Sequence, residues 1–351
     1  MTRRTATSST AGVVLVVLTC VALLLPVPYV TLRPGPTRDV LATSDGKPIV
    51  EIDGHRTYPT DGSLSLTTVS VTSAGQEVGL LEAFQAWFSP TDAIVPRDSV
   101  YPPEQTAEEA EQESAEQMAS SQEVSAVAAL RLLGDQVPEK LMVTEVDDDG
   151  PAADSLRQGD RIIGIDGVRV TSAKQGLADL RAREPGNDVE VDVRRDGQRR
   201  AFTLATQPSP DDEAIPVIGI QVGVDYILPF DVRINLGDEI GGPSAGTVFA
   251  LAIYDKLTEG SLIGGMDVAG TGSILADGTV ESIGGIQQKV VGAEDAGASV
   301  FLVPAANCEE ALGGDVDASD ITLVDVATLE DAVDALSALT DDPGAEVETC
   351  G

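Results

Sequence analysis

Residues 241–246, Gly-Gly-Pro-Ser-Ala-Gly, constrain the fold more than any other segment, because they demand a tight turn that opens directly into a helix. Proline suits the first helical turn, and apolar side chains recur at roughly helical spacing over residues 244–257. We therefore predict a helix beginning at Ser244. Its free N-terminal N–H groups would lie beside the serine hydroxyl, where such groups stabilise an oxyanion.

A serine hydroxyl becomes an effective nucleophile only when a neighbouring base takes its proton. The single histidine, His55, lies far upstream. Residues 242–246 also match the Gly-x-Ser-x-Gly elbow of α/β-hydrolases, but that triad needs a histidine after the serine, so this interpretation fails. Lys289 is the best remaining candidate for the base.

Lys289 lies in a predicted helix among the apolar residues Ile283, Ile286 and Val290. A lysine acts as a base only when neutral, so its pKa must fall from about 10.4 to near 7 or 8. Desolvation among aliphatic side chains is the usual cause of such a fall. The sequence therefore predicts a Ser244–Lys289 pair, with a solvated helix lysine as the alternative.

Four segments resemble, in order and approximate spacing, the proteolytic domain of Lon-type proteases. They are residues 242–246, 269–274, 283–289 and 296–304, and the resemblance covers roughly residues 232–335. Lon enzymes also carry an ATPase module with a Gly-x-x-x-x-Gly-Lys-Ser/Thr phosphate loop, and this sequence contains no such run. We therefore expect proteolysis that is independent of ATP and uses no cofactor.

The resemblance implies that Ser244 is the nucleophile, Lys289 the general base and Thr271 a hydroxyl that helps to hold the lysine amine. The residues it implies as supporting the serine are Gly242, Pro243 and Ala245. Two positions depart from the usual Lon pattern: Gly241 replaces an acidic residue and Ser273 replaces a glutamate. These departures keep a catalytically silent protein open as an alternative.

A β-rich module precedes this region and resembles a PDZ domain. Residues 141–146 alternate as a strand, residues 149–153 predict a short helix, and residues 189–204 predict a hairpin turned at Asp196-Gly197. PDZ domains bind extended peptides by adding a strand to a sheet edge, with backbone amides holding the peptide carboxylate. We place that carboxylate loop at residues 129–134. A module that only packs against its neighbour is the alternative.

The N-terminal region predicts a membrane anchor. Residues 11–30 are uncharged and follow Arg3 and Arg4, and at roughly 1.5 Å per residue such a helix spans about 30 Å. A signal peptide is the alternative, but no Ala-x-Ala-like site follows the apolar run closely. The positive-inside bias then places everything after residue 31 outside the cytoplasm.

Composition and cysteines fit this placement. The chain has 351 residues and a net charge of −36, which disfavours nucleic acid and anionic lipid headgroups as partners. Cys308 and Cys350 are a possible disulfide in an oxidising compartment, with two free thiols as the alternative, and no Cys or His cluster has metal-ligand spacing. Trp87, the only tryptophan, is expected in the core, with a membrane-interface position as the alternative.

These expectations combine into an α+β protein: a membrane-anchored, extracytoplasmic serine endopeptidase that binds protein or peptide substrates through its PDZ and protease clefts. A PDZ scaffold that recruits exported proteins is the alternative, as is a signal-peptidase-like Ser-Lys enzyme on another fold. Lon-type domains commonly form rings, so a homo-oligomer is also expected. The expected divisions are a cytoplasmic end (1–9), an anchor (10–30), a segment lending strands to the protease (31–125, including an exposed acidic helix over 103–125), a PDZ domain with two helices (126–207), the Lon-type domain (208–340) and a tail (341–351).

Overall fold

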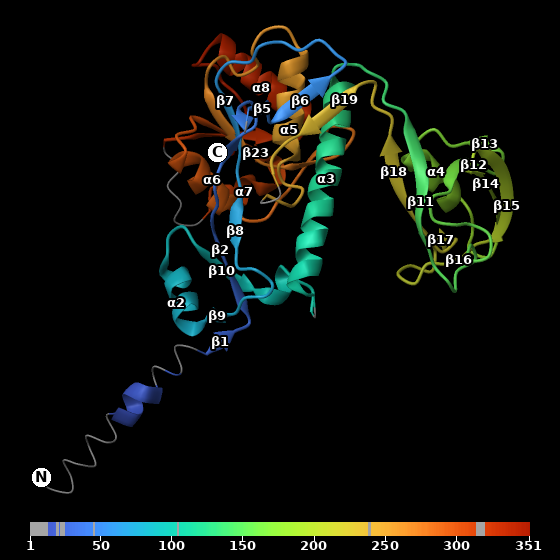
Figure 1. The fold of residues 1–351 in the computed structure, drawn as a ribbon, viewed down its shortest axis with the longest axis horizontal. Helices are drawn as coiled ribbons and strands as arrows, with labels where there is room; N and C mark the ends of the chain where they lie inside the picture. Colours follow the sequence, from blue (N-terminus) through green and yellow to red (C-terminus); the bar gives the residue numbers. More distant parts are fainter. Residues whose placement is uncertain are drawn as a thin grey trace, which may run out of the picture. The chain divides into compact units, whose positions relative to one another are not determined.

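The computed structural model describes residues 13–18, 21, 25–44, 46–103, 105–237, 240–313 and 320–351, and the chain divides into two units. The first comprises Met1–Gly134 and Phe230–Gly351, and the second comprises Asp135–Pro229. The second unit is therefore inserted between two halves of the first (Figure 1). The expected PDZ boundaries differ from this division, because residues 126–134 belong to the first unit and residues 208–229 to the second.

A five-stranded sheet organises the first unit, in the order β24-β23-β20-β7-β3. Its strands are β3 (Arg38–Asp39), β7 (Ser63–Leu66), β20 (Asp267–Gly270), β23 (Val300–Pro304) and β24 (Thr322–Val326). All neighbouring pairs are parallel except β3 with β7. Because β7 pairs with β20, the N-terminal half supplies an inner strand of the sheet that the C-terminal half builds.

Four helices pack on this sheet: α5 (Gly246–Leu257), α6 (Ile286–Asp295), α7 (Cys308–Ala311) and α8 (Leu329–Asp341). A further helix, α3 (Ala107–Leu132), packs on α5 and α8. The helix α5 is buried along almost its whole length and packs against α3 and α8, whereas α6 packs against α7 and β23. An apolar helix enclosed in this way is a core helix, which agrees with the aliphatic run after Ser244.

A second sheet, β10-β2-β8, completes the first unit together with short pairs and the helix α2 (Leu80–Phe88). Its strands are β2 (Tyr29–Pro34), β8 (Val69–Val71) and β10 (Ala93–Pro96). The short pairs are β1 (Pro26–Val27) with β9 (Val78–Gly79), β4 (Thr43–Ser44) with β5 (Lys47–Pro48), β6 (Val50–Asp53) with β19 (Asp231–Ile234), and β21 (Ser273–Ile274) with β22 (Val280–Glu281). The 3₁₀ turns are Arg97–Ser99 and Ala305–Asn307.

The second unit is a β-sheet in the order β15-β14-β12-β11-β18 with one helix, α4 (Ala173–Arg181). Its strands are β11 (Glu139–Val146), β12 (Arg161–Ile165), β13 (Val168–Arg169), β14 (Asp188–Arg195), β15 (Gln198–Ala205), β16 (Gln207–Pro208), β17 (Pro216–Val217) and β18 (Ile220–Tyr226). The expectation of a second helix at residues 149–153 was wrong, because this stretch forms turns. Pro151 has no N–H to donate, and Ala152 donates its own to the carbonyl of Ile218 instead of to a helical neighbour.

The anchor prediction is wrong at its C-terminal end, because β1 and β2 begin at Pro26 and Tyr29. Prolines at 26 and 28 and β-branched residues at 27, 30 and 31 favour extended backbone. Val13–Leu18 are helical and exposed. Residues 10–12, 19, 20 and 22–24 of the expected anchor lie outside the described residues. Among the helices that the structure describes, none combines the length and apolar character needed to cross a bilayer.

The acidic helix is longer than expected and only half solvated. A capping box between Thr106 and Glu109 starts α3, and the helix continues to Leu132. Its C-terminal half is buried against α5, with Ala129 and Leu130 at 0% exposure. The placement of a carboxylate-binding loop at residues 129–134 was therefore wrong, because most of that stretch is helix in the core of the first unit.

Cys308 and Cys350 form a disulfide with 5.0 Å between their Cα atoms. The N–H of Cys350 also donates to the carbonyl of Leu323, so the tail is held against β24. The sequence left open a disulfide or two free thiols, and the structure has the disulfide.

Removing this bridge should destabilise the fold. A double Cys308→Ala, Cys350→Ala variant frees a loop with a sequence separation of 42 residues, which lowers the free energy of unfolding by about 4 kcal/mol. Urea denaturation of the variant and of the wild-type chain measures the difference. Reduced wild-type protein should match the variant, and equal stability of the oxidised and reduced wild type would contradict the expectation.

Candidate active site

Ser244 lies in the turn between Gly242 and the start of α5. Gly242 has a φ of 82°, a left-handed conformation that favours glycine. The carbonyl of Ser244 accepts hydrogen bonds from the N–H of Gly272 (2.8 Å) and the hydroxyl of Thr271 (3.0 Å). This carbonyl is therefore engaged outside the helix, and α5 begins at Gly246 rather than at Ser244 as predicted.

Lys289 lies in the first turn of α6, after Gly285 with a φ of 68°. Its side chain is buried, with 3% exposure. Ile286 and Val290 on the same helix are at 0% and belong to the apolar cluster between α6 and the sheet. The prediction of an apolar setting for this lysine is therefore confirmed by its burial.

Three polar side chains meet at this point, although their positions in the sequence are far apart. The Nζ of Lys289 lies 2.8 Å from the Oγ of Ser244 and 2.9 Å from the Oγ1 of Thr271. The Thr271 hydroxyl gives its proton to the Ser244 carbonyl, so toward the lysine it can only accept. A neutral amine that donates to Thr271 keeps a lone pair with which it can accept a proton from the Ser244 hydroxyl.

Burial sets the charge of this lysine. Desolvation lowers the pKa of Lys289 from its ordinary 10.5 to about 7. Within the described residues no carboxylate forms an ion pair with its amine, so nothing offsets the cost of burying the charge. Near neutral pH a large fraction of the protein therefore carries a free amine 2.8 Å from a serine hydroxyl.

The helix α3 fixes the loop that carries Ser244. Ser121 Oγ donates to the carbonyl of Pro243 (3.0 Å), and Ser125 Oγ donates to the carbonyl of Gly246 (2.9 Å). The N–H of Gly242 donates to the carbonyl of Ser114 (2.9 Å). We did not predict these contacts. The available signal was a row of uncharged positions, 114, 118, 121 and 125, at helical spacing within the acidic helix.

The same helix explains the glycine at 241. A β-carbon at this position would collide with the Ser114 side chain. An acidic side chain, which the Lon pattern usually has there, would require the Ser114 side chain to move. The glycine at 241 therefore suits the close approach of α3 and is compatible with the geometry of Ser244 and Lys289.

A cleft of about 610 Å³ opens over Ser244 and Lys289. Its walls come from β8, α3 and the loop before Ser244, and include Val69, Ser70, Val71, Met118, Ile240 and Gly241. Within the described ranges the N–H groups of Ser244 and Ala245 have no protein acceptor. In that part of the chain no group of three or more His, Cys, Asp or Glu side chains is arranged to hold a metal ion.

The second unit has a groove of its own, of about 270 Å³, between α4 and the edge strand β18. Leu177 and Leu180 of α4 and Ile220 and Val222 of β18 line it with aliphatic side chains. Lys174 and Arg181 add two cations at its wall. In the described residues β18 pairs only with β11, so its other edge is free to accept a strand.

A short loop beside this groove leads into β18, far from residues 129–134 in the sequence. The segment that leads into the free edge is residues 217–220, Val-Ile-Gly-Ile, with Gly219 at a φ of 71°. This segment follows the hairpin at residues 189–204, which the sequence analysis places at the end of the module. The strand that it leads into, β18, pairs with β11, which is distant in the sequence. Sequence periodicity reports local structure and gave no signal of this pairing.

Comparisons with known proteins match both units. The PDZ domain family model matches residues 113–206, and the model of the Lon protease (S16) C-terminal proteolytic domain matches residues 238–336. The PDZ match begins inside α3, whereas the second unit begins at Asp135. The helix α3 packs in the core of the first unit, so the structural boundary of the PDZ unit lies after α3.

Individual relatives cover the same two regions. A probable periplasmic serine endoprotease DegP-like protein of Halomonas elongata is 40% identical over 22% of this chain and 16% of its own length. The Lon protease of Mycolicibacterium smegmatis is 33% identical over 31% of this chain and 13% of its own length. The PDZ domain of an SdrC-like protein from Listeria monocytogenes is 26% identical, with 23% of this chain and 85% of that domain covered and a TM-score of 0.22. The chain thus spans less than a fifth of the two full-length relatives.

Proposed function

We propose that this chain, which contains a PDZ domain and a Lon-type proteolytic domain, is a serine endopeptidase that cleaves unfolded or extended polypeptides without ATP. The observation that carries the proposal is the 2.8 Å contact between the Ser244 hydroxyl and the amine of a buried lysine whose pKa is lowered to about 7. A nucleophile with an adjacent, partly neutral base and a third group that orients it is the arrangement that acyl transfer requires.

In the acylation step the neutral Lys289 amine takes the Ser244 proton while Oγ attacks the substrate carbonyl carbon. The free N–H groups of Ser244 and Ala245 are the nearest donors for the oxyanion that forms, and one such donor contributes roughly 3 to 4 kcal/mol. The protonated lysine then gives its proton to the leaving amine. The products of this step are an ester on Ser244 and the first peptide.

Deacylation reverses these roles. Once Lys289 is neutral again, it takes a proton from a water molecule that attacks the ester carbonyl, and the proton returns to Oγ when the second peptide leaves. Thr271 stays hydrogen-bonded to the amine and to the Ser244 carbonyl, so the base keeps its direction through both steps.

The proposal places the protease outside the cytoplasm and anchored by the apolar N-terminal segment. Support comes from the apolar run of residues 11–25, in which Val13–Leu18 are helical with 51–66% exposure. The disulfide between Cys308 and Cys350 fits an oxidising compartment. The groove beside β18 is proposed to bind an extended peptide by strand addition.

The experiment that tests this function uses the full chain in lipid vesicles with a reduced, unfolded protein as substrate and no nucleotide. We expect fragments to appear with the wild-type chain and an acyl adduct on Ser244 to be trapped by rapid acid quenching and identified by mass spectrometry. An intact substrate, with peptides still bound at the β18 groove, would overturn the protease in favour of a PDZ scaffold.

Thr271→Val should weaken catalysis without removing the dyad. Losing a hydrogen bond to an ionisable amine costs about 1.5 to 3 kcal/mol, so kcat/KM should fall roughly 10- to 150-fold. Steady-state kinetics measure the loss. Thr271→Ser keeps the hydroxyl and is the matched control, which should recover most of the rate. An equal loss in both variants would contradict the role of the hydroxyl.

Leu177→Glu should impair peptide binding by the second unit. Leu177 is 40% exposed on the α4 wall of the groove, and a charge there places a carboxylate where an apolar peptide side chain would lie. Against a library of peptides with free C-termini we expect affinity to fall at least tenfold, about 1.4 kcal/mol. Val168→Glu, at 52% exposure on β13, is the control. Equal effects of the two would place the peptide elsewhere.

A further inference from the structure

The helix α2 presents its large apolar side chains to the outside and its small ones to the protein. Ala83 and Ala86 face inward at 7% and 2% exposure. The outward residues, which we call the α2 patch, are Leu81 (47%), Phe84 (55%), Trp87 (74%) and Phe88 (76%). The Phe84 and Phe88 rings lie 6.0 Å apart, so the exposed aromatics are contiguous along the helix. A soluble surface rarely leaves such a group uncovered.

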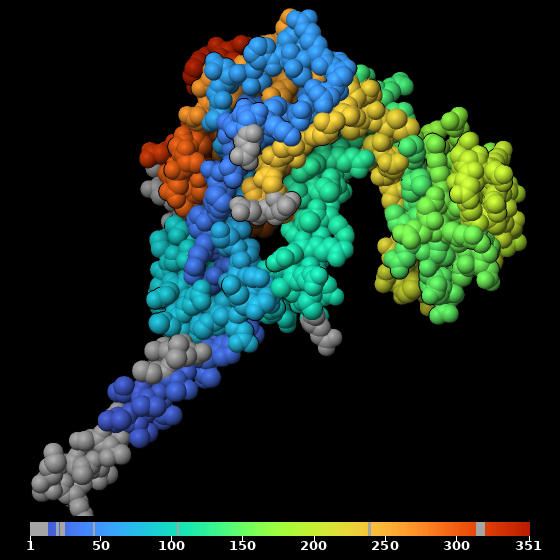
Figure 2. Space-filling view, in the orientation of Figure 1, coloured from blue at the N-terminus to red at the C-terminus, as the bar shows by residue number. Residues whose placement is uncertain are grey.

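The α2 patch begins where the apolar N-terminal segment ends. The pair β1·β9 joins residues 26–27 to residues 78–79, directly before α2. The N–H of Leu80 donates to the carbonyl of Leu25, the last residue of the uncharged run that precedes Pro26. Figure 2 shows the corresponding contact between the cyan surface around α2 and the blue N-terminal strands. A membrane that holds the N-terminal segment therefore lies next to α2 as well.

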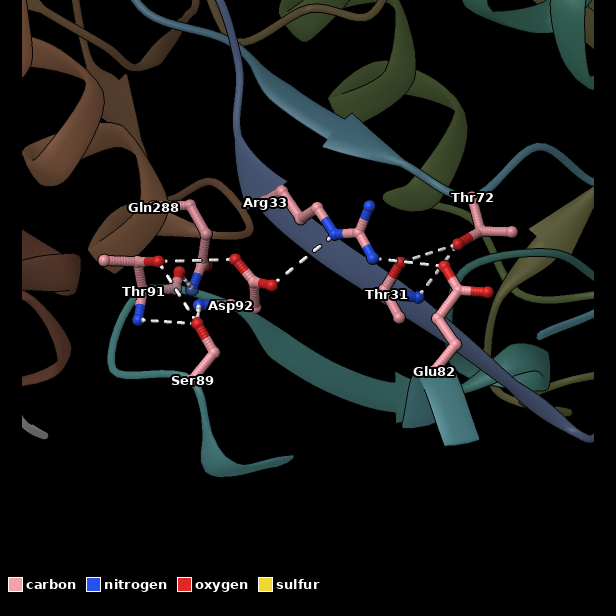
Figure 3. A network of polar contacts seen from close by, with 8 residues as sticks. All are labelled: Thr31, Arg33, Thr72, Glu82, Ser89, Thr91, Asp92 and Gln288. Carbon is pink, nitrogen blue, oxygen red and sulfur yellow. Dashed lines mark hydrogen bonds and ion pairs between the residues drawn. The ribbon is translucent and has the colours of Figure 1, made fainter. Parts of the chain in front are cut away.

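Part of the negative charge at this end of the unit is neutralised, in a chain whose net charge is −36. Glu82 is the only charged residue of α2. Arg33 of β2 pairs with Glu82 (3.1 Å) and with Asp92 (3.5 Å), one on each side, as Figure 3 shows. Arg33 thus reduces the electrostatic repulsion between these two carboxylates and the negative charges of a lipid headgroup layer.

The same network ties α2 to the catalytic helix. Thr91, in the turn after α2, accepts a hydrogen bond from the Nε2 of Gln288 (3.1 Å), and Gln288 is the neighbour of Lys289 in α6 (Figure 3). The position of α2 is therefore fixed relative to the active-site cleft within the first unit.

We propose that the α2 patch inserts into the interfacial layer of the bilayer, parallel to the membrane plane, and so holds the protease cleft at the lipid surface. This inference rests on the proposed membrane anchoring. Tryptophan and phenylalanine on one face of a helix are suited to the headgroup and acyl boundary. The consequence is a restriction of substrates to polypeptide segments within reach of the membrane surface.

Trp87 is the only tryptophan of the chain, so its fluorescence reports on the α2 patch directly. The full chain is placed in phosphatidylcholine vesicles with and without brominated acyl chains, and quenching by aqueous iodide is measured in parallel. We expect emission at shorter wavelength than in detergent-free buffer, strong quenching by bromine near the headgroup end of the acyl chain, and protection from iodide. The double variant Phe84→Ser, Phe88→Ser should restore iodide quenching.

A matched reporter, Trp87→Phe with Leu312→Trp, moves the fluorophore to another exposed apolar site of the same unit, 54% exposed. This reporter should stay accessible to iodide and insensitive to bromine.

Vesicle flotation is scored separately. A chain that floats while Trp87 remains iodide-accessible overturns this inference and leaves the anchor standing, whereas a chain that does not float overturns both. Protection of Trp87 that grows with protein concentration in the absence of lipid would assign the patch to a second copy and also overturn it.

Discussion

Ser244→Ala should abolish peptide-bond hydrolysis, with a loss on the order of 10⁴-fold or more in kcat. The alanine has no hydroxyl to form the acyl intermediate, and no second serine is hydrogen-bonded to the Lys289 amine among the described residues. Initial rates on an unfolded protein substrate measure the loss. Ser299→Ala, which removes an exposed hydroxyl of the same unit, should retain the wild-type rate.

Lys289→Arg should be equally inactive, because a guanidinium stays charged at any accessible pH and cannot act as a base. Lys140→Arg, at a surface lysine paired with Asp225, is its matched control. Residual activity in Lys289→Arg that is within tenfold of the wild type would show that another group activates the serine.

Lys289→Met should make the protein more stable while it removes activity. Burial in the folded chain disfavours the charged form of Lys289 and so lowers its pKa. In the unfolded chain the pKa of this lysine is near 10.5. Between pH 7 and pH 10.5 the unfolded state binds more protons, so wild-type stability rises with pH across this window and the full penalty applies below it. The penalty that methionine removes is about 5 kcal/mol at pH 6.

Urea denaturation of both chains at several pH values checks this expectation. The advantage of Lys289→Met should be largest below pH 7 and should shrink toward zero as the pH approaches 10.5. Lys140→Met should change stability by only about 0.5 kcal/mol, because the lysine is exposed. A Lys289→Met variant that is less stable than wild type at pH 6 would mean that the lysine is not buried at an energetic cost.

The residues of the candidate site could be found from the sequence because their signals are local. Ser244 stands in a glycine-rich turn before an apolar helix, Lys289 is surrounded by aliphatic neighbours, and Thr271 follows from the resemblance to Lon-type domains. Burial of the lysine and the contacts among the three side chains agree with that interpretation.

What the sequence did not predict depends on contacts between distant segments. The helix α3 was expected to be solvated, yet its uncharged positions pack on α5 and hold the Ser244 loop through Ser121 and Ser125. The strand β18 belongs to the PDZ sheet only through its pairing with β11. Trp87 was expected in the core, and its 74% exposure contradicts the general preference of a large aromatic residue for burial. The large apolar residues of α2 recur at helical spacing, but this periodicity does not tell whether the face they form is buried or exposed.

The most direct test of the account is the pH dependence of kcat/KM for the wild-type chain in vesicles, without nucleotide, from about pH 5 to about pH 9. A base that must be neutral, with a pKa lowered to about 7 by burial, predicts a rate that rises tenfold per pH unit below pH 7 and levels off above it. A rate that is independent of pH through this range, or that is still rising tenfold per pH unit at pH 9, would contradict the claim that a buried neutral Lys289 activates Ser244.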